Sequence, residues 1–492
     1  MSRGSTYNKY SVRNKNNNRK KKNNIITGLI MAGAFIVALI IVINLASAGG
    51  KKNDNKPAET VVASESSQEE TTTAAPADKR SEALKTAEAQ AVQYDYDGAI
   101  KTLESVEGAE SDEEISKLIK DYEDKKDSLV AVSPQNVTHV FFHSLIVDPA
   151  RGFSLNGNSS WDRLTPGFCQ WMTTCYEFDR MMEEMYKRGF VLVSLYDMVD
   201  ITKDADGVEH IEGKSIYLPE GKKPFVLSLD DLSYYHSYDG RGCASKMIVG
   251  DDGKPTCEYV TADGKTEVGS YDCIPRLDEF VEKHPDFSYK GAKGTVALTG
   301  YNGILGYRTD PAYRDKNEDD LLDDQIAWLK DNPDFDWDKE CEEAKKVADA
   351  VKADGWTFAS HTWGHIRIGD SELDRIKIDT ANWKEGVEPL VGETDMIIFA
   401  HGQDLASWDE EYSESDKFKY LKSEGYSIFC NVDGSTQYFV QIDDEFLRMG
   451  RRNLDGIRLW QAVYGGKDYL SDLFDPSEVI DPDRPTDSSL YQ

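Results

Sequence analysis

Runs of apolar, β-branched and aromatic residues alternate with amphipathic helical patterns from residue 137 to residue 460. The predicted strands are, in chain order, Val137–Leu145, Phe190–Leu195, Pro224–Leu229, Gly294–Leu298, Trp356–Ala359, Met396–Ala400 and Tyr426–Val432. Helical periodicity separates several of them, at Tyr176–Arg188, Ile274–Lys283, Asp338–Ala353 and Ser371–Lys384. Seven strands with intervening helices predict an α/β domain on a mostly parallel sheet that closes as a barrel.

Two segments interrupt this alternation. Residues 203–223 and 239–271 are rich in Asp and Gly, so we expect them to be insertions on loops. Loops of this kind often carry substrate contacts in barrel proteins.

The chain before the barrel has a different pattern. Residues 25–46 form its only long apolar run, and 22 residues at helical rise span the hydrocarbon core of a bilayer. The basic residues before it predict a cytoplasmic N-terminus, with everything after the run outside the membrane. The alternative is a cleaved signal peptide, because Ala46-Ser47-Ala48 fits a cleavage pattern; the length of the apolar run favours an uncleaved anchor.

The remaining segments complete the predicted organisation. Residues 1–24 are a basic cytoplasmic tail, and residues 47–78 are polar and predict a disordered tether. Residues 79–130 return to helical spacing and predict a short helical stalk. The barrel domain occupies residues 137–460, and residues 461–492 are a C-terminal tail.

Charge limits the range of partners. The chain of 492 residues has 57 basic and 89 acidic residues, a net charge of −32. The first 24 residues hold eight of the basic residues and no acidic one, which leaves the remainder at −40. Nucleic acid is therefore excluded as the main partner, because its binding depends on cations that neutralise phosphates.

The cysteines do not indicate a disulfide or metal-binding pattern. There are seven, at positions 169, 175, 243, 257, 273, 341 and 430. Their number is odd and no C-x-x-C pair occurs, so a structural zinc knot is not indicated. Disulfides and isolated buried thiols both remain open, and we predict no pairing.

Adjacent carboxylates follow one strand directly, in Ser228-Leu229-Asp230-Asp231-Leu232. At the carboxyl end of a barrel strand both side chains can reach the mouth, where one can bind metal and the other can act as a base. In so acidic a chain, an Asp-Asp pair is also common as a solvated turn.

Two histidines end another strand, in His361-Thr362-Trp363-Gly364-His365. A spacing of four residues places both imidazoles on one face of a helical turn, although satisfied structural histidines would give the same pattern. Taken with the carboxylate they form a donor set that suits Zn²⁺ or a similar transition metal.

These two segments resemble the motifs of the polysaccharide deacetylases with a NodB homology domain, carbohydrate esterase family 4. The first family motif, [ST]-[FL]-D-D-[GA], is similar to residues 228–232, and the second, H-[ST]-x-x-H, matches His361 to His365. The resemblance extends over residues 137–460 and implies a distorted (β/α)7-type barrel. It implies that Asp231, His361 and His365 hold a divalent metal, most readily Zn²⁺, and that Asp230 is the catalytic base.

The chain also departs from the family pattern. The Arg of the third motif is not visible, and no His follows His401, so the usual C-terminal L-x-H motif that supplies the acid is missing. His143, which ends the first strand, resembles the acid of permuted members, the poly-N-acetylglucosamine deacetylases; a structural strand-end His is the alternative. Weaker predictions for substrate contact are His401, His236, Tyr307 and Arg308. His236 is also a rival to His143 for the acid, on a loop rich in tyrosine (Tyr234, Tyr235 and Tyr238).

The sequence therefore predicts a membrane-anchored, metal-dependent hydrolase with an extracellular catalytic domain. Its expected substrate is an N-acetylated cell-wall or extracellular polysaccharide. Two alternatives stay open: an O-acetyl glycan esterase of the same fold, and a catalytically decayed glycan-binding protein.

Overall fold

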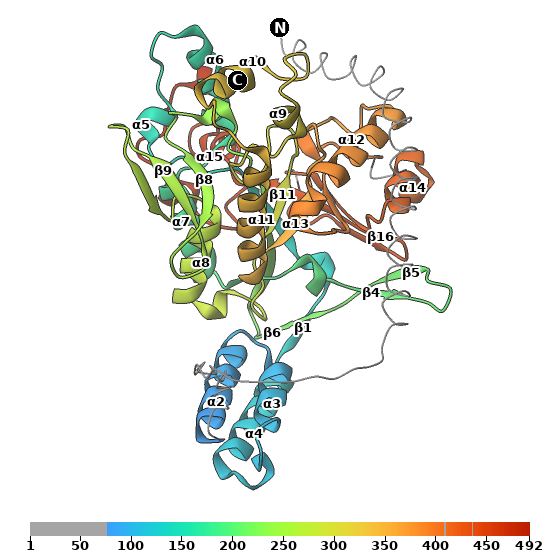
Figure 1. The fold of residues 1–492 in the computed structure, drawn as a ribbon. Coiled ribbons are helices and arrows are strands. Elements are labelled where there is room, and N and C mark those ends of the chain that lie inside the picture. Colours follow the sequence, from blue (N-terminus) through green and yellow to red (C-terminus); the bar gives the residue numbers. More distant parts are fainter. Residues whose placement is uncertain (1–75, 408–409, 435) are drawn as a thin grey trace, which may run out of the picture. The chain divides into compact units, whose positions relative to one another are not determined.

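Seven parallel strands close a barrel in the computed structural model, which describes residues 76–407, 410–434 and 436–492 (Figure 1). In order around the barrel they are β2 (Thr138–Phe142), β7 (Lys223–Asp231), β11 (Thr295–Leu298), β12 (Thr357–Ser360), β13 (Met396–Ile398), β14 (Ile428–Val432) and β16 (Phe446–Asn453). The last strand pairs in parallel with the first, through Arg451 and His139, and closes the ring. The predicted seven-stranded α/β barrel is confirmed.

One predicted strand lies outside this ring. The segment expected at 190–195 forms β3 (Phe190–Leu192), which pairs with the beginning of β7, at Lys223–Phe225, and has a single bridge to Ser288 on its other side. The seventh barrel strand is instead β16, which the sequence pattern did not predict. Its sequence FLRMGRRN reads as polar, yet all eight residues are buried. The three arginines of β16 are buried because each pairs with a carboxylate: Arg448 with Asp404, Arg451 with Asp230 and Arg452 with Asp472.

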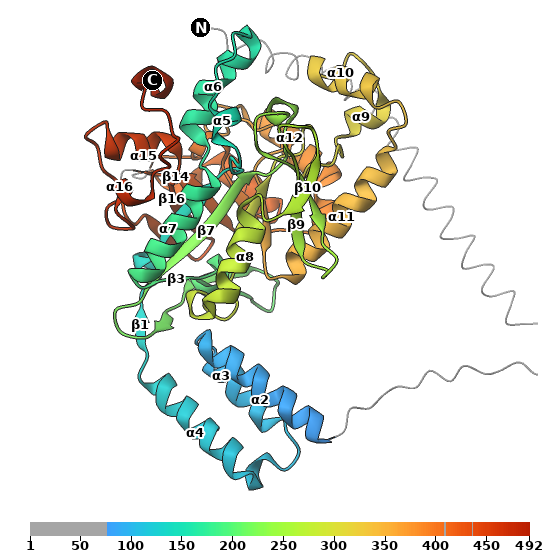
Figure 2. The ribbon, with the colours of Figure 1, turned by 90° about the vertical axis from the view of Figure 1, so that its left-hand side faces the viewer.

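Helices surround the barrel (Figure 2). Those predicted from periodicity are α7 (Cys175–Lys187), α8 (Cys273–Lys283), α11 (Trp337–Ala353) and α12 (Leu373–Gly386). The others are α5 (Pro149–Gly152), α6 (Ser159–Trp171), α9 (Pro311–Asp315), α10 (Asp323–Asp331), α13 (Glu388–Val391), α14 (Asp416–Ser423), α15 (Gly456–Val463) and α16 (Pro476–Val479). The N-terminus of α7 has a capping box, in which Thr174 and Glu177 satisfy each other's backbone N–H groups.

The predicted insertions form small antiparallel ladders. The first contains β5 (Glu209–Gly213), paired with β4 (Val199–Lys203), and β6 (Ile216–Leu218), paired with β1 (Val130–Val132). The second forms a three-stranded sheet of β8 (Ala244–Val249), β9 (Pro255–Val260) and β10 (Thr266–Gly269). A further strand, β15 (Val440–Asp443), pairs antiparallel with β16.

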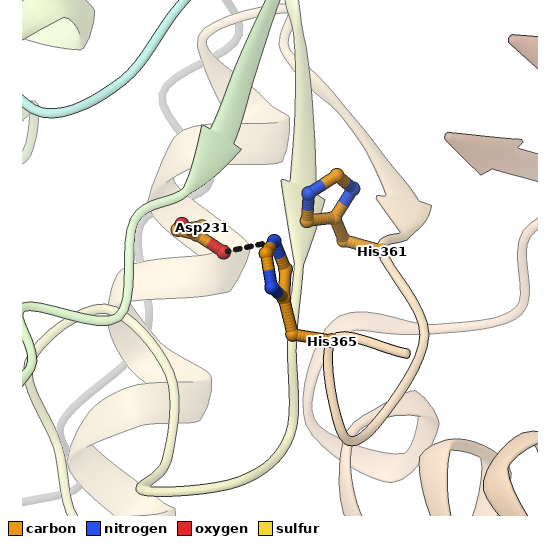
Figure 3. A group of neighbouring side chains, drawn as sticks. All are labelled: Asp231, His361 and His365. Atoms are coloured by element: carbon orange, nitrogen blue, oxygen red, sulfur yellow. Dashed lines mark ion pairs between the residues drawn. The ribbon is translucent and has the colours of Figure 1, made fainter. Parts of the chain in front are cut away.

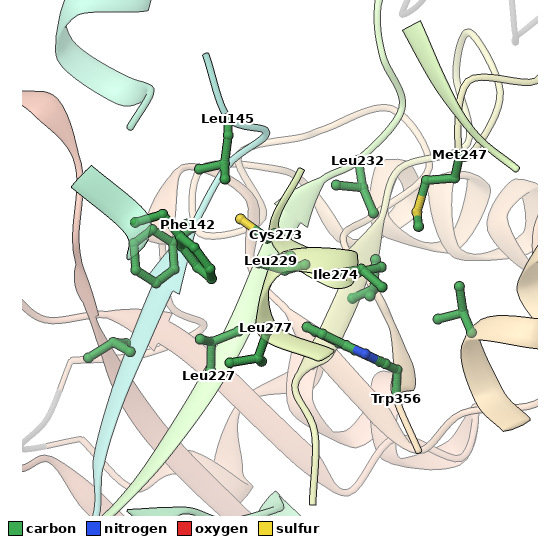
Figure 4. Close-up of a cluster of buried hydrophobic side chains, with 14 of the residues drawn as sticks. Phe142, Leu145, Leu227, Leu229, Leu232, Met247, Cys273, Ile274, Leu277 and Trp356 are labelled. Carbon is green, nitrogen blue, oxygen red and sulfur yellow. The ribbon is translucent and has the colours of Figure 1, made fainter. Parts of the chain in front are cut away.

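Strand alternation divides the core into two layers. On β7, Leu227 and Leu229 pack outward against the helices, where Leu277 of α8 and Trp356 also lie (Figure 4). Val226 belongs to a second cluster of buried apolar side chains, which fills the barrel interior. Asp230 has the same parity as Val226, so alternation directs its carboxylate to the inside of the barrel, at the carboxyl end of the strand.

Three helices precede the barrel, in the segment predicted as a stalk: α2 (Pro76–Val92), α3 (Tyr96–Glu104) and α4 (Glu113–Asp127). They share a small core of their own. The turn between α2 and α3 contacts the barrel domain, since the Tyr94 hydroxyl donates to the Asp286 carbonyl (2.9 Å) and Lys290 N–H to the Gln93 carbonyl (2.8 Å).

The predicted tail, membrane helix and most of the tether, residues 1–75, lie outside the described residues. Within the described ranges, every helix is too short or too polar to span a bilayer.

The segment predicted as a C-terminal tail packs onto the barrel domain. Leu473 and Phe474 are fully buried in the outer core layer. Arg484 is also fully buried, and its guanidinium pairs with Glu177 of α7. These residues therefore belong to the domain, because they close part of its core.

Replacement of Phe474 by Ala tests this packing. Loss of a buried aromatic ring should lower the free energy of unfolding by about 3–5 kcal/mol, measured by urea denaturation. The matched control is Tyr464→Ala, since Tyr464 keeps 49% of its surface exposed and should change stability far less. Equal, small effects of both substitutions would show that the segment does not belong to the core.

Candidate active site

The two adjacent carboxylates lie at the carboxyl end of β7. The register places Asp231 beside Leu298 of β11, and Leu298 in turn beside Ser360 of β12. His361 follows Ser360 directly, and its N–H donates to the Leu298 carbonyl (2.9 Å). In the sheet, therefore, only β11 lies between the strand that carries the carboxylates and the strand that His361 follows.

Asp231, His361 and His365 converge on one point (Figure 3). One ligand atom from each residue lies within 4.8 Å of the other two. The His365 Nε2 atom is 3.8 Å from Asp231 Oδ1. The His361 Nδ1 atom is 2.8 Å from the Ile398 carbonyl, which can only accept, so Nδ1 carries the proton and Nε2 keeps its lone pair.

The chemistry of this set fits a divalent metal. Burial lowers the pKa of His361 to about 4 and that of His365 to about 3, so both imidazoles are neutral near pH 7 and can act as ligands. Two neutral imidazoles and one carboxylate form a three-ligand set of the kind that catalytic zinc sites use, with further positions left for water and substrate.

Hydrogen bonds from its backbone to α12 hold the turn that carries the two histidines. Asp379 of α12 accepts hydrogen bonds from the backbone N–H groups of Trp363 (2.7 Å) and Gly364 (2.9 Å). Burial raises the pKa of Asp379 to about 6. The Thr362 hydroxyl accepts from Ile366 N–H (2.9 Å), which tightens the same turn. These bonds fix the separation of the two imidazoles.

Left-handed backbone conformations concentrate at this end of the barrel. Most of the non-glycine residues with positive φ among the described residues lie in loops that leave β7, β11, β12 or β13. Those close to the site are Asp231 (73°), Leu232 (39°), Tyr234 (47°), Thr362 (62°), His365 (49°) and His401 (59°). Such conformations cost free energy and are typical of functional sites, where the surrounding structure maintains them. Strand alternation would point the side chains of Asp230 and Asp231 to opposite faces of the sheet. The positive φ at Asp231 ends this alternation.

A buried ion pair holds Asp230. The Arg451 guanidinium of β16 donates to both carboxylate oxygens, at 2.6 and 3.0 Å, and both side chains are almost fully buried. Burial alone would raise the pKa of Asp230, but Arg451 and His361 outweigh it and hold the pKa well below its usual range. Asp230 is therefore ionised near neutral pH.

Sequence reasoning missed Arg451 because it missed the strand that carries it. The only sequence signal is the Arg451-Arg452 pair at the end of an apolar-polar alternation, in which one side chain faces inward and the next outward.

His143 lies at the same end of the barrel, one residue after β2. Its Nδ1 atom is buried and has no hydrogen-bond partner among the described residues, and its ring packs edge-on against Phe141. His143 is also close enough to Asp230, and to Asp455 at the start of α15, to favour the ionised form of both carboxylates. Deeper in the barrel, His139 bonds through Nε2 to Ser228 (3.0 Å).

The weaker predictions have different environments. His401 is exposed and its ring centroid is 4.3 Å from that of His365, so it borders the candidate metal site. Both ring nitrogens of His236 have partners, Tyr313 Oη (2.8 Å) and Asp239 Oδ2 (3.2 Å). Tyr307 is buried in the outer core layer, and Arg308 is buried with its guanidinium on the carbonyls of residues 233 and 234. His236, Tyr307 and Arg308 therefore support the loops around the site, while His401 faces it.

The seven cysteines are all free thiols in the structure, and six of them are buried. Burial raises their pKa values, for example that of Cys175 to about 12. Of the two alternatives left open by the sequence, the structure therefore shows isolated thiols and not disulfides.

No protein-family model and no curated protein matches the chain. Among solved structures, a Streptococcus pyogenes deacetylase, PplD, in complex with acetate matches with 12% identity and a TM-score of 0.32, over 67% of this chain and 94% of that one. A polysaccharide deacetylase from Bacillus cereus, BC0361, matches with 12% identity and a TM-score of 0.33, over 72% and 70%. Both of these proteins are named as deacetylases.

Removal of Arg451 tests the buried ion pair. In wild type the lowered pKa of Asp230 contributes stability above the unfolded pKa of about 3.9, and this contribution is lost as the pH falls. In Arg451→Met the Asp230 carboxylate stays buried without its cation, and burial then raises its pKa. The uncompensated charge should cost about 3–5 kcal/mol of folding free energy at pH 7 and clearly less at pH 4, where the carboxylate can be protonated. Urea denaturation at the two pH values measures both differences.

Arg452→Met is the matched control on the same strand. Its partner Asp472 keeps 30% of its side-chain surface exposed, so the loss at pH 7 should be smaller. A loss from Arg451→Met that is the same at pH 4 and pH 7 would contradict a buried charge on Asp230.

Metal content tests the ligand set. We expect the full-length protein to retain about one divalent ion per chain after dialysis, and His361→Ala and Asp231→Asn to lose it, because three ligands are the minimum of such sites. Elemental analysis of each variant gives the ratio. His284→Ala, which removes an imidazole that packs against Tyr186 and Phe280 instead, should keep the metal.

Proposed function

We propose that this protein is a metal-dependent deacetylase that acts on an acetylated carbohydrate. The observation that carries the proposal is the convergence of Asp231, His361 and His365 beside the ion-paired carboxylate of Asp230, at the carboxyl end of a parallel barrel. The resemblance of residues 228–232 and 361–365 to deacetylase motifs agrees with this arrangement.

A divalent metal held by Asp231, His361 and His365 would polarise the acetyl carbonyl and make a water molecule more acidic. Asp230 accepts the proton that the water loses as its oxygen attacks the carbonyl carbon. Arg451 keeps that carboxylate ionised and fixes its orientation through two hydrogen bonds. The roles of Asp230 and Asp231 differ because only Asp230 has a cationic partner of this kind in the described structure.

His143 is the proposed acid. When the carbon–nitrogen bond breaks, the leaving amine nitrogen needs a proton, and an imidazolium can supply it near neutral pH. The position of His143 after β2 and its buried, unpartnered Nδ1 support this role. Acetate and the free amine are the products, with one water consumed.

We propose an N-acetylated polysaccharide as the substrate class. An amine leaving group requires an acid, the role proposed for His143, whereas ester hydrolysis needs an acid less. The alternative of an O-acetyl esterase is a separate outcome of the test below. Extracellular placement depends on residues 25–46, which lie outside the described residues, and stays a prediction.

Acetate release from a panel of acetylated glycans tests the function. Full-length protein should release acetate from N-acetylhexosamine polymers, lose this activity with a chelator, and regain it when Zn²⁺ is restored. Release from O-acetylated xylan alone would establish the esterase instead. Metal binding without release from any polymer would support the glycan-binding alternative.

A leaving-group comparison tests His143. His143→Ala should lower kcat for an N-acetylated oligosaccharide about 10²–10⁴-fold, because the amine leaves unprotonated. An aryl acetate ester should be affected much less, since a phenolate leaves without protonation. His236→Ala is the control, because both of its ring nitrogens already have partners, Asp239 in the same loop and Tyr313 of α9. Equal losses on amide and ester would argue against an acid role.

A further inference from the structure

A phenol adjoins the candidate metal site without being a ligand. Tyr235 lies four residues after Asp231 on the loop that leaves β7, and its hydroxyl donates to Asp231 Oδ1 at 3.0 Å. The same Oδ1 atom faces His365 Nε2 at 3.8 Å. The hydrogen bond from Tyr235 thus ends on the carboxylate oxygen that points toward the other ligands.

Counting protons gives the direction of the hydrogen bonds around Tyr235. Its oxygen is also 2.7 Å from Thr299 Oγ1, and Thr299 Oγ1 is 3.0 Å from Ser233 Oγ. Each hydroxyl has a single proton, and a carboxylate or carbonyl oxygen can only accept, so Tyr235 donates to Asp231 Oδ1 and Ser233 donates to the Asp231 carbonyl (3.0 Å). The proton of Thr299 is then the one left for the contact with Tyr235, the shorter of its two contacts. A bond donated by Thr299 to the phenol strengthens the bond that the phenol donates to Asp231.

The ring of Tyr235 is fixed by its neighbours. It stacks on Tyr301 with a centroid distance of 5.1 Å and an interplanar angle of 19°, and it packs edge-on against Tyr238 at 5.6 Å. Tyr301 follows β11 whereas Tyr235 follows β7, so the stack joins two loops. The hydroxyl therefore reaches Asp231 from a rigid support.

Asp231 needs such support more than an ordinary strand residue. Its own φ of 73° and that of Leu232, 39°, take the chain out of strand geometry at this point. The carboxylate can rotate about its Cβ–Cγ bond, and the separation of 3.8 Å between Asp231 Oδ1 and His365 Nε2 is too long for a hydrogen bond that would stop this rotation.

We propose that Tyr235 is a positioning residue for the candidate metal centre, and that its hydroxyl, backed by Thr299, orients the Asp231 carboxylate toward His361 and His365. This role rests on the proposed metal site. Groups that orient metal ligands in this way typically change metal affinity 10–100-fold when they are removed.

The test compares two phenols of one loop in the full-length protein. Tyr235→Phe removes only the hydroxyl on Asp231 and should weaken Zn²⁺ binding about 10–100-fold, measured by competition with a chromogenic chelator. Tyr234→Phe is the matched control, because the Tyr234 hydroxyl donates to Asp272 (2.8 Å), a carboxylate outside the ligand set. Its Zn²⁺ affinity should equal that of wild type.

Thr299→Val gives a second variant that keeps Tyr235. It removes the donor behind the phenol, so we expect a smaller loss of Zn²⁺ affinity in the same direction. Replacement of zinc by Co²⁺ adds a spectroscopic readout, since the visible bands of the wild type and of Tyr234→Phe should coincide while those of Tyr235→Phe shift. Thermal melts of the metal-free proteins identify any variant that is unfolded.

The outcomes are distinct. Wild-type affinity and an unchanged Co²⁺ spectrum in folded Tyr235→Phe, or equal losses in the Tyr234 and Tyr235 variants, would overturn the positioning role and leave the proposed function standing. Absence of Zn²⁺ binding by the wild type would overturn the metal centre and this role with it. Selective loss in Tyr235→Phe would support the role even if the substrate were an ester.

Discussion

The ion pair between Arg451 and Asp230 is the interaction on which the site depends. It joins β16 to β7 across the interior of the barrel, next to the point where β16 and β2 close the ring. A charged pair without solvent is stabilising only when its geometry is good and its remaining polar atoms are satisfied. Here two hydrogen bonds join the pair, Ser228 and the Asn431 carbonyl accept further N–H groups of Arg451, and its guanidinium lies 4.2 Å from the Phe141 ring centroid.

Around this pair the structure gives two neighbouring carboxylates different surroundings. Asp230 faces a guanidinium inside the barrel, whereas Asp231, turned by a left-handed backbone, faces two neutral imidazoles. Two residues of the same type therefore differ in backbone conformation and in electrostatic surroundings. The loops that maintain this difference have strained backbone conformations, and buried acceptors such as Asp379 hold them in place.

Much of this arrangement follows from the sequence. Six of the seven barrel strands are apolar runs, and the Asp-Asp and His-x-x-x-His segments end two of them, so their meeting at the barrel mouth is a consequence of parallel topology. The seventh strand was not predictable from hydropathy, because Arg448, Arg451 and Arg452 are buried only through partners that lie 20 to 221 residues away in the chain. Tyr235 was visible as part of a Tyr-rich loop, but no sequence pattern shows which of its phenols reaches Asp231. Local patterns predict elements and chemistry, and the long-range pairs that orient them come from the fold.

X-ray absorption at the zinc edge of the loaded full-length protein most directly tests whether Asp231, His361 and His365 hold one metal. The ligand set predicts nitrogen and oxygen neighbours at about 2.0–2.2 Å, with the multiple-scattering features of two imidazoles. These features should be reduced in His365→Ala. A shell dominated by sulfur at about 2.3 Å, or an oxygen-only shell without imidazole scattering, would contradict the proposed centre.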